Sequence, residues 1–445
     1  MSKIVIIGLG SGGFAASLAI RRIDPQASIT IIEKRNYEMF SPCGLPFAIE
    51  GIVPLDKLKF SLPSDKYTAK LLEHEVYSIN STEKILAVRD LKNGKDISIA
   101  YDSLIIATGA KPFIPSIQGI EENIGKNVFI LFDIESAQKI MDFDCKKAVV
   151  VGAGPIGLEI AVALNKKGID ATVVEMLSYA LPRSIDRDMA QILEKSLEEN
   201  QKIKLFFNRT VSGLRGSPVD SILIGDKTIE TDMVVLASGV KANLEMAKNA
   251  GIEIGRWGIR TNSRMETNIK GIYAIGDCIE TVSYINHRPI TMQLSSAAFR
   301  QGIVAGTNAA DGYDIYEGAL STFTSLIGDV EVAATGFNQF FAEVAGFQTI
   351  SGKAKGKNKP EYYPCSKDIT VKIIADAKNG KVLGGQAIGE GAGARINVIS
   401  LAIKSGLNIF DLSKAEMVYC PMLAENYDVL NKAADFAIRK FEKKK

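Results

Sequence analysis

The sequence predicts an α/β protein in which one strand–helix–strand unit occurs twice, ahead of an α+β region. Residues 3–35 hold a buried strand (KIVIIG), a helix rich in Ala and Ser, and a second strand (SITIIE). The same order recurs at residues 146–175 as KKAVVVG, a helix and DATVVE. Short apolar runs on either side of a helix are typical of parallel strands. Two copies therefore predict two Rossmann-like folds in one chain.

The last quarter of the chain has a different pattern. From about residue 320 the runs SLIGDVEVAATG, ITVKIIA and KVLGGQAIG favour an antiparallel sheet, and helices are expected at 390–405 and 425–442. The lysine-rich segment 352–360 (GKAKGKNKP) is predicted to be a solvated hairpin tip or loop, because runs of charge usually face water.

Composition excludes several classes of protein. The 445 residues carry a net charge of only +2, which favours neither nucleic acid nor an anionic membrane as partner. The longest apolar stretch, 148–164, contains Glu159 and several glycine or proline residues, so it does not read as a membrane span. Five scattered cysteines and two histidines lack metal-ligand spacing, and no metal is expected. The first strand leaves no room for a signal peptide, so we expect a cytoplasmic protein with reduced thiols.

The first strand ends in a glycine fingerprint, Gly8-x-Gly10-x-x-Gly13. In such a loop the first glycine permits a tight turn and the second lets the backbone approach a pyrophosphate, while the third allows close helix packing. Glu33 closes the second strand twenty residues after Gly13, where a carboxylate accepts hydrogen bonds from an adenosine ribose. This unit predicts a dinucleotide site.

The second unit repeats the fingerprint as Gly152-x-Gly154-x-x-Gly157, with Pro155 and Ile156 inside it. Glu175 stands at the end of the following strand, where an acid repels a 2′-phosphate and favours NADH over NADPH. Arg183 or Arg187, further along, could return to bind that phosphate. Glu159, on the first turn of the helix, either orients the nicotinamide or is an exposed acid favoured by the helix dipole.

Three strand-end turns accompany the fingerprints. They are Ala107-Thr108-Gly109, Ala237-Ser238-Gly239 and Gly276-Asp277, and a helix is expected from about Ser295 to Gly306. A carboxylate at Asp277 could hold the ribityl hydroxyls of a flavin, while the positive end of that helix faces the isoalloxazine ring.

Over essentially its whole length the order of these elements resembles the flavoprotein pyridine nucleotide–disulfide oxidoreductases. The resemblance implies that the first fingerprint binds FAD, the second binds NAD(P)H, and the C-terminal region dimerises and completes the partner's active site. The implied domains are 1–112 with 242–319 for FAD, 113–241 for NAD(P)H and 320–445 for dimerisation. Further cofactor contacts are implied at Ser11, Gly12, Lys34, Ser41, Pro42, Val76 and Ala298.

The placement of cysteines selects a branch of this family. The chain lacks the early Cys-x4-Cys pair of glutathione- and lipoamide-type reductases and the Cys-x-x-Cys of thioredoxin reductases, but it has Cys43 in SPCGLPF. That resembles the single-cysteine branch of coenzyme A-disulfide reductases, persulfide reductases, NADH oxidases and NADH peroxidases. EYYPC (361–365) and VYCP (418–421) agree. The peroxidase histidine in the first glycine loop is replaced here by Ser11 and Gly12, which ranks that activity lower.

A single redox thiol has a clear chemical use. Without a second cysteine in the loop, oxidised Cys43 must be a mixed disulfide, a persulfide or a sulfenic acid. The alternative, a buried small apolar side chain, is the usual role of a lone cysteine. For Cys145, Cys278 and Cys365 that plain role is predicted. Cys420 could instead resolve a Cys43 adduct across the dimer.

Other residues of the predicted site are tyrosines and arginines. Tyr362, Tyr363 and Tyr419 resemble tyrosines of coenzyme A-disulfide reductases and could donate a proton to a leaving thiolate, or could be plain interface residues. Met422 and Leu423 depart from that pattern, which leaves Tyr427 as another candidate. Arg21 and Arg22 end the first helix and either contact coenzyme A phosphates or complement the helix dipole.

The sequence thus predicts an FAD-dependent, NADH-linked homodimer that reduces a coenzyme A disulfide or persulfide through Cys43, with coenzyme A as substrate or bound ligand. An NADH oxidase is the alternative, and a redox-responsive flavin-binding sensor is the third hypothesis. No rhodanese-like extension follows the last helix, so any sulfur-transfer partner would be a separate protein.

Overall fold

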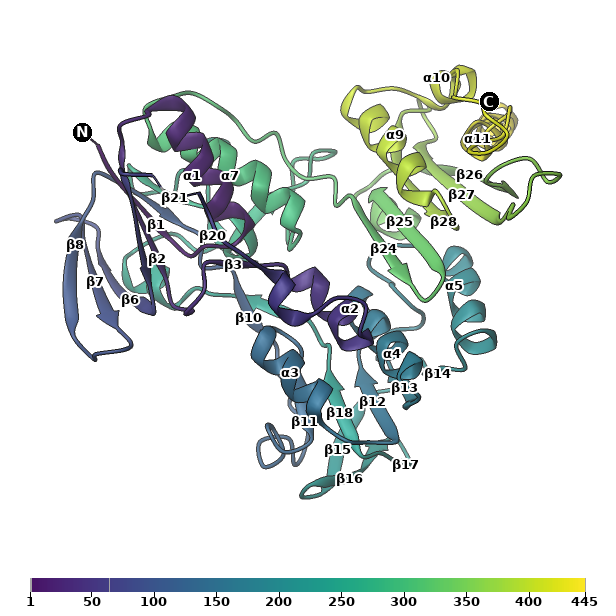
Figure 1. The fold of residues 1–445 in the computed structure, drawn as a ribbon. Helices are drawn as coiled ribbons and strands as arrows, with labels where there is room; N and C mark the ends of the chain where they lie inside the picture. Colours follow the sequence, from purple (N-terminus) through teal and green to yellow (C-terminus); the bar gives the residue numbers. More distant parts are fainter. Residues whose placement is uncertain (1, 64, 445) are drawn as a thin grey trace. The chain divides into compact units, whose positions relative to one another are not determined.

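The computed structural model describes residues 2–63 and 65–444, which form two compact units. Unit 1 contains residues 1–44, 54–113 and 240–319, and unit 2 contains residues 45–53, 114–239 and 320–445. The short segment 45–53 thus leaves unit 1 and packs with unit 2. Figure 1 shows the elements of each unit along the chain.

Unit 1 is built on a five-stranded parallel sheet in the order β21-β9-β1-β2-β5. Its strands are β1 (Lys3–Ile7), β2 (Ser28–Glu33), β5 (Thr68–Leu72), β9 (Ser103–Ile106) and β21 (Ile272–Ala274). Helices α1 (Ser11–Ile23) and α7 (Ser295–Ala309) pack together (Figure 1), because a side chain at Gly302 or Gly306 would collide with the α1 backbone. These small-residue helices bring both helix N-termini to one end of the unit.

Smaller elements complete unit 1. An antiparallel sheet contains β6 (His74–Asn80), β7 (Ile85–Asp90) and β8 (Asp96–Ala100). The short pieces are β3 (Met39–Phe40), η1 (Pro42–Gly44), η2 (Leu55–Leu58), β4 (Lys59–Phe60), β10 (Ala110–Pro112), β19 (Val240–Ala242), α6 (Glu245–Asn249), β20 (Ile259–Arg260), η3 (Gly276–Cys278), β22 (Ile279–Val282) and β23 (Pro289–Ile290).

Unit 2 begins with a second five-stranded parallel sheet, in the order β11-β18-β12-β13-β14. These strands are β11 (Val128–Ile130), β12 (Lys147–Val151), β13 (Asp170–Val174), β14 (Lys204–Phe206) and β18 (Met233–Leu236). The other elements of this part are α2 (Leu45–Glu50), α3 (Ile134–Asp142), α4 (Pro155–Lys166), α5 (Arg187–Glu199), β15 (Val211–Gly216), β16 (Val219–Ile224) and β17 (Lys227–Glu230). The two predicted Rossmann-like folds are therefore confirmed.

The C-terminal part of unit 2 is an antiparallel sheet in the order β24-β25-β28-β27-β26, as predicted. Its strands are β24 (Phe323–Ile327), β25 (Val330–Gly336), β26 (Thr349–Lys357), β27 (Asp368–Asp376) and β28 (Val382–Ile388). The helices are α8 (Gln339–Val344), α9 (Ala392–Lys404), α10 (Ile409–Lys414) and α11 (Val429–Lys444), of which α9 and α11 pack on the sheet (Figure 1).

The prediction of a loop at 352–360 was wrong for most of that segment. Residues up to Lys357 belong to β26, the edge strand, and pair with β27. Glycine and alanine alternate with lysine there: Gly352 and Ala354 are buried beneath α11, while Lys353 and Lys355 face outward. A side chain at Gly352 would collide with α11, so the glycine is a packing requirement. Lysines on an edge strand also discourage pairing with another sheet.

The helices are too short or too polar to cross a lipid bilayer. The longest helix within residues 2–63 and 65–444 is α11, which has 16 residues, including several lysines. No helix in the described part of the chain combines the length and the apolar character that a membrane span requires.

Candidate functional site

The first glycine loop has the geometry that its fingerprint predicts. Gly8 has a φ of +98°, and a side chain there would strike the carbonyl of Ala107. A side chain at Gly13 would strike the carbonyl of Gly8, so the third glycine lets α1 pack on the loop. No atom lies within 4 Å of a Cβ built on Gly10, which begins α1 without a side-chain cap. The open face at Gly10 and the free helix N–H groups form a cradle for phosphate.

The second glycine loop repeats these contacts. Gly152 has a φ of +114° and meets the carbonyl of Ala237, and Gly157 meets the carbonyl of Gly152. A Cβ on Gly154 would again meet nothing within 4 Å, and Pro155 begins α4 as a pre-organised first residue. In both loops the second glycine has open space beside it. The third glycine lies so close to the carbonyl of the first that no side chain would fit there.

A carboxylate stands beside each loop, buried at Glu33 and partly exposed at Glu175. The Glu33 carboxylate accepts hydrogen bonds from the backbone N–H of Leu9 (2.8 Å) and of Arg35 (3.1 Å). The Glu175 carboxylate accepts equivalent bonds from Ala153 (2.7 Å) and Leu177 (2.8 Å). Each acid is therefore fixed at the end of its strand, where its carboxylate can accept a hydrogen bond from a ribose hydroxyl.

The two carboxylates differ in one neighbour, Arg35, which the sequence analysis missed. Its guanidinium pairs with Glu33 through two nitrogens (2.9 and 2.7 Å) and lies against the rings of Tyr37 and Phe40. Burial opposes the charge, but the bonds to Glu33 raise the pKa of Arg35. Within the described residues no lysine or arginine pairs with Glu175, which keeps its negative charge uncompensated. The sequence did contain a signal for this pairing: the residue two positions after the strand-end acid is Arg35 in the first unit and Leu177 in the second.

Asp277 is presented by a turn that depends on a glycine. Gly276 adopts a φ of +76°, and its N–H donates to the Gln301 side-chain oxygen (2.9 Å) on α7. Burial raises the pKa of Asp277 to about 6. In the described part of the chain no hydrogen-bond donor accompanies this carboxylate, so its acceptor capacity is available to ligand hydroxyl groups. Gln301 was also missed by the sequence analysis.

The N-terminus of α7 lies beside the first glycine loop. The hydroxyls of Ser11 and Ser295 are 2.7 Å apart, and a side chain at Gly12 would approach the Ala298 carbonyl at 3.3 Å. Leu294, at the N-cap of α7, supplies no side-chain hydrogen bond, so the first N–H groups of that helix remain available. The predicted residues of both helices meet in unit 1, where with Asp277 they suit a flavin dinucleotide.

Cys43 occupies the short helical turn η1 and is exposed. The turn is fixed because the Ser41 N–H donates to the Leu58 carbonyl (2.9 Å), and a side chain at Gly44 would collide with Leu58. Burial instead raises the pKa of the Cys145 and Cys278 thiols to about 11, so both stay protonated at neutral pH. This contrast leaves Cys43 much better placed to act as a thiolate than these two.

Glu159 is half-buried on α4 and is not an exposed acid. The Ser325 hydroxyl donates to its carboxylate (2.6 Å) from strand β24. Burial raises the pKa of Glu159, and the bond from Ser325 partly offsets that effect. Glu159 is the fifth residue of α4, so it lies just beyond the first turn where we expected it, as a carboxyl group whose pKa is raised.

Residues 2–302 match the sequence profile of the pyridine nucleotide-disulphide oxidoreductases, and residues 322–430 match the dimerisation domain of the same proteins. The chain belongs to this family. An NADH oxidase of Methanocaldococcus jannaschii is 35% identical over 99% of this chain and 100% of the relative. A NAD(P)H coenzyme A polysulfide/persulfide reductase of Pyrococcus horikoshii is 30% identical over 96% of each chain. The structure of a NAD-dependent persulfide reductase from A. fulgidus has a TM-score of 0.94 at 33% identity, over 99% of this chain and 84% of that one.

Membership confirms the predicted family and fold class. This pyridine nucleotide-disulphide oxidoreductase depends on FAD and NAD(P)H and carries a dimerisation domain at 322–430. The names of the relatives include both a sulfur reductase and an oxidase.

Two of the predicted tyrosines of this oxidoreductase lie together on the dimerisation domain. Tyr362 and Tyr419 are 74% and 52% exposed, and their mutual hydrogen bond raises the pKa of Tyr362. Tyr363 donates its backbone N–H to the Pro360 carbonyl, while the Tyr427 hydroxyl bonds Asp435. Exposed, mutually bonded phenols on a dimerisation domain suit a role that a second subunit completes.

The remaining predicted contacts differ in their surroundings. Arg21 is engaged by the Pro25 and Ala27 carbonyls, Thr68 and Asp65. Arg22 is exposed, and its hydrogen bond among the described residues is a long one, to the Thr307 hydroxyl at 3.5 Å. Arg22 thus has the more available guanidinium. Lys34 is exposed beside Glu33, while Val76 packs in the core of unit 1.

Proposed function

We propose that this chain is an NADH-dependent reductase of coenzyme A disulfide or persulfide that acts through Cys43 as a homodimer. The observation that carries the proposal is the exposed Cys43 in a fixed turn, in contrast to the partly buried Cys145 and the buried Cys278, whose thiol pKa values are raised. The name of the Pyrococcus relative supports coenzyme A polysulfide or persulfide as the substrate class.

The proposed reaction uses the thiolate of Cys43. Bound FAD would supply two-electron transfer between NADH and sulfur, held by the first glycine loop, Glu33 and Asp277. The Cys43 thiolate attacks one sulfur of the disulfide, so that the old S–S bond breaks and one thiol leaves with a proton. Two electrons from NADH then break the Cys43–S–S–coenzyme A bond, which regenerates the Cys43 thiolate and releases coenzyme A as the thiol with one proton. A persulfide releases hydrosulfide in the first step and gives the same adduct.

The leaving thiolate needs a proton donor. Tyr362 and Tyr419 are proposed for this role, acting in the partner's site, because both are exposed on the dimerisation domain and hydrogen-bonded to each other. Arg22 is the proposed contact for a coenzyme A phosphate, since its guanidinium is exposed.

The second candidate function is an NADH oxidase. The name of the Methanocaldococcus relative favours it, and Cys43 would then cycle through a sulfenic acid. The decisive assay is anaerobic NADH oxidation by the FAD-loaded protein with coenzyme A disulfide, coenzyme A persulfide or glutathione disulfide. Rapid turnover with a coenzyme A substrate alone supports the reductase. Turnover that appears only when oxygen is admitted rejects the reductase and supports the oxidase.

Glu175→Gln is expected to reduce the preference for NADH over NADPH by about tenfold or more, because a hydrogen bond to a charged acceptor contributes about 1.5–3 kcal/mol. NADH loses that bond, and a 2′-phosphate is no longer repelled by an uncompensated carboxylate. The measurement is kcat/KM for each nucleotide with ferricyanide as acceptor. Glu199→Gln, a change at an exposed acid on α5, is the control. An unchanged ratio in Glu175→Gln would show that this acid does not discriminate.

A further inference from the structure

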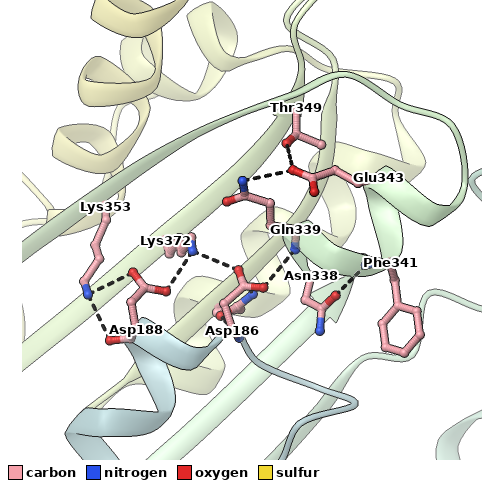
Figure 2. Close-up of polar contacts among 10 residues, drawn as sticks. Asp186, Asp188, Asn338, Gln339, Phe341, Glu343, Thr349, Lys353 and Lys372 are labelled. Atoms are coloured by element: carbon pink, nitrogen blue, oxygen red, sulfur yellow. Dashed lines mark hydrogen bonds and ion pairs between the residues drawn. The ribbon is translucent and has the colours of Figure 1, made fainter. Parts of the chain in front are cut away.

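An ionic cluster centred on the buried Lys372 in unit 2 links the C-terminal sheet to the second glycine loop. Figure 2 shows Lys372 between Asp186 and Asp188, with Lys353 beyond Asp188. Lys372 comes from β27 and Lys353 from β26, whereas both aspartates lie at the start of α5. The Lys372 side chain is only 7% exposed. A buried lysine is costly unless it is paired, so this cluster is a specific feature of the fold.

Both carboxylate oxygens and the backbone N–H of Asp186 are hydrogen-bonded in this cluster. Its carboxylate accepts hydrogen bonds from Lys372 (2.9 Å), from the Gln386 side-chain nitrogen (2.8 Å) and from the Gln339 backbone N–H (3.0 Å). Its own N–H donates to the Gln386 side-chain oxygen (2.9 Å). Asp186 and Gln386 are thus reciprocally bonded, and both are buried. The start of α5 is held in one position by β27, β28 and α8.

The electrostatics agree with this geometry. Burial lowers the pKa of Lys372, but its bonds to Asp188 and Asp186 outweigh burial and raise it. Burial raises the pKa of Asp188, but the bonds from Lys372 and Lys353 outweigh that effect and lower it. The pairing therefore favours the charged forms of Lys372 and Asp188.

A continuous set of contacts runs from Asp186 to the glycine loop. The N–H groups of Ser184 and Ile185 donate to the Leu181 carbonyl (2.9 and 3.1 Å), and the Leu181 N–H donates to the Ala153 carbonyl (3.0 Å). Ala153 lies between Gly152 and Gly154, and its N–H is the donor to Glu175. The turn from Leu181 to Asp186 is thus the link between the cluster and the second fingerprint.

Leu181 shows that this turn is held from outside. Its φ of +54° lies in the left-handed region, which a non-glycine residue seldom adopts. Such a conformation persists only where the surrounding structure enforces it. The fixed start of α5, immediately beyond the turn, supplies that constraint.

We propose that Asp186, fixed by Lys372 and Gln386, is a positioning residue that holds the Leu181–Asp186 turn and thereby the Ala153 segment of the glycine loop for NADH. The inference rests on the proposed binding of NADH by this loop. Its consequence is that the sheet of the dimerisation domain sets the affinity for the pyridine nucleotide.

The test compares Lys372→Met and Gln386→Met in the FAD-loaded protein. The probe is 1,4,5,6-tetrahydro-NAD, which binds without donating hydride, and its Kd is measured by calorimetry. We expect Kd to rise about five- to tenfold in each variant, the scale of coupling through a packed network. With ferricyanide as acceptor, KM for NADH rises similarly while kcat at saturating NADH stays within about twofold, since the residue acts on binding.

Two controls separate positioning from loss of stability. Lys355→Met removes an exposed lysine of the edge strand β26 that pairs with Asp368, and its Kd should match the wild type. Ile373→Ala opens the buried core of β27 without touching Asp186. It should lower the unfolding temperature but leave Kd unchanged.

Two results would overturn the inference. One is a Kd within twofold of wild type in whichever of Lys372→Met and Gln386→Met folds with full FAD. The other is an equal loss of affinity in Ile373→Ala. If the wild-type protein itself does not bind the analogue, the assignment of the second loop to NADH fails, and the inference fails with it.

Discussion

Cys43→Ser is expected to abolish anaerobic NADH-dependent reduction of coenzyme A disulfide and persulfide, with kcat falling by about three orders of magnitude or more, as loss of a covalent nucleophile does. A serine hydroxyl forms no mixed disulfide, so the first bond of the proposed reaction cannot form. NADH oxidation with ferricyanide should survive, because that acceptor bypasses the thiol. The steady-state rates with the two kinds of acceptor are the measurement.

Cys145→Ser is the matched control for this experiment. Burial raises the pKa of the Cys145 thiol to about 11, and the reaction assigned to Cys43 does not involve this residue. Rates should therefore equal those of the wild type with either acceptor. Retention of disulfide reduction in Cys43→Ser would refute the role of Cys43. If Cys43→Ser instead consumes oxygen and releases hydrogen peroxide where the wild type forms water, the oxidase cycle gains support.

Much of the dinucleotide-binding architecture was predictable because glycine positions have local causes. Gly8 and Gly152 need a positive φ, and Gly13 and Gly157 need an absent side chain, in a strand–loop–helix context that the sequence displays directly. Glu33 and Glu175 could be predicted because each stands where the second strand of its strand–helix–strand unit ends. These features depend on neighbours close in the chain, so pattern alone locates them.

Other features depend on partners that are far apart in the chain. Gln386 meets Asp186 across 200 residues, and Gln301 meets Gly276 from another element, so no local motif marks either contact. The strand β26 was missed because its lysines resembled a solvated run, although the alternation of Gly352 and Ala354 with lysine had the period of a strand. The pairing of Arg35 with Glu33 was local and could have been noticed as an acid and a base two residues apart.

Asp277→Asn is expected to weaken FAD binding by about ten- to a hundredfold at pH 8, because it removes a charged acceptor for ribityl hydroxyls, and such bonds contribute about 1.5–3 kcal/mol. Burial raises the pKa of Asp277 to about 6 in the unliganded protein. Hydroxyl donors favour the ionised carboxylate, so FAD binding should release this proton. Wild-type affinity for FAD is then expected to fall as the pH drops below about 6, while the affinity of Asp277→Asn stays flat.

The same pKa fixes the sign of a stability effect in the flavin-free protein. Asp277 binds its proton more tightly when folded than when unfolded, since its pKa rises from 3.8 to about 6. Its favourable contribution is therefore fully present below pH 4 and is lost as the pH rises through about 6, a change of about 3 kcal/mol. Flavin-free Asp277→Asn should lack this loss, so its stability relative to the wild type should increase between pH 4 and pH 8.

Fluorescence titration of the flavin-free proteins with FAD from pH 5 to pH 8, and urea unfolding from pH 4 to pH 8, measure the two effects. Asp102→Asn alters an exposed acid of unit 1 that bonds the Lys3 N–H, and it should change neither profile. A wild-type FAD affinity that is independent of pH, together with unimpaired binding by Asp277→Asn, would remove Asp277 from the flavin site. If the affinity for FAD depends on pH in the wild type but not in Asp277→Asn, the Asp277 carboxylate binds the flavin. The same buried carboxylate then destabilises the flavin-free protein above pH 6.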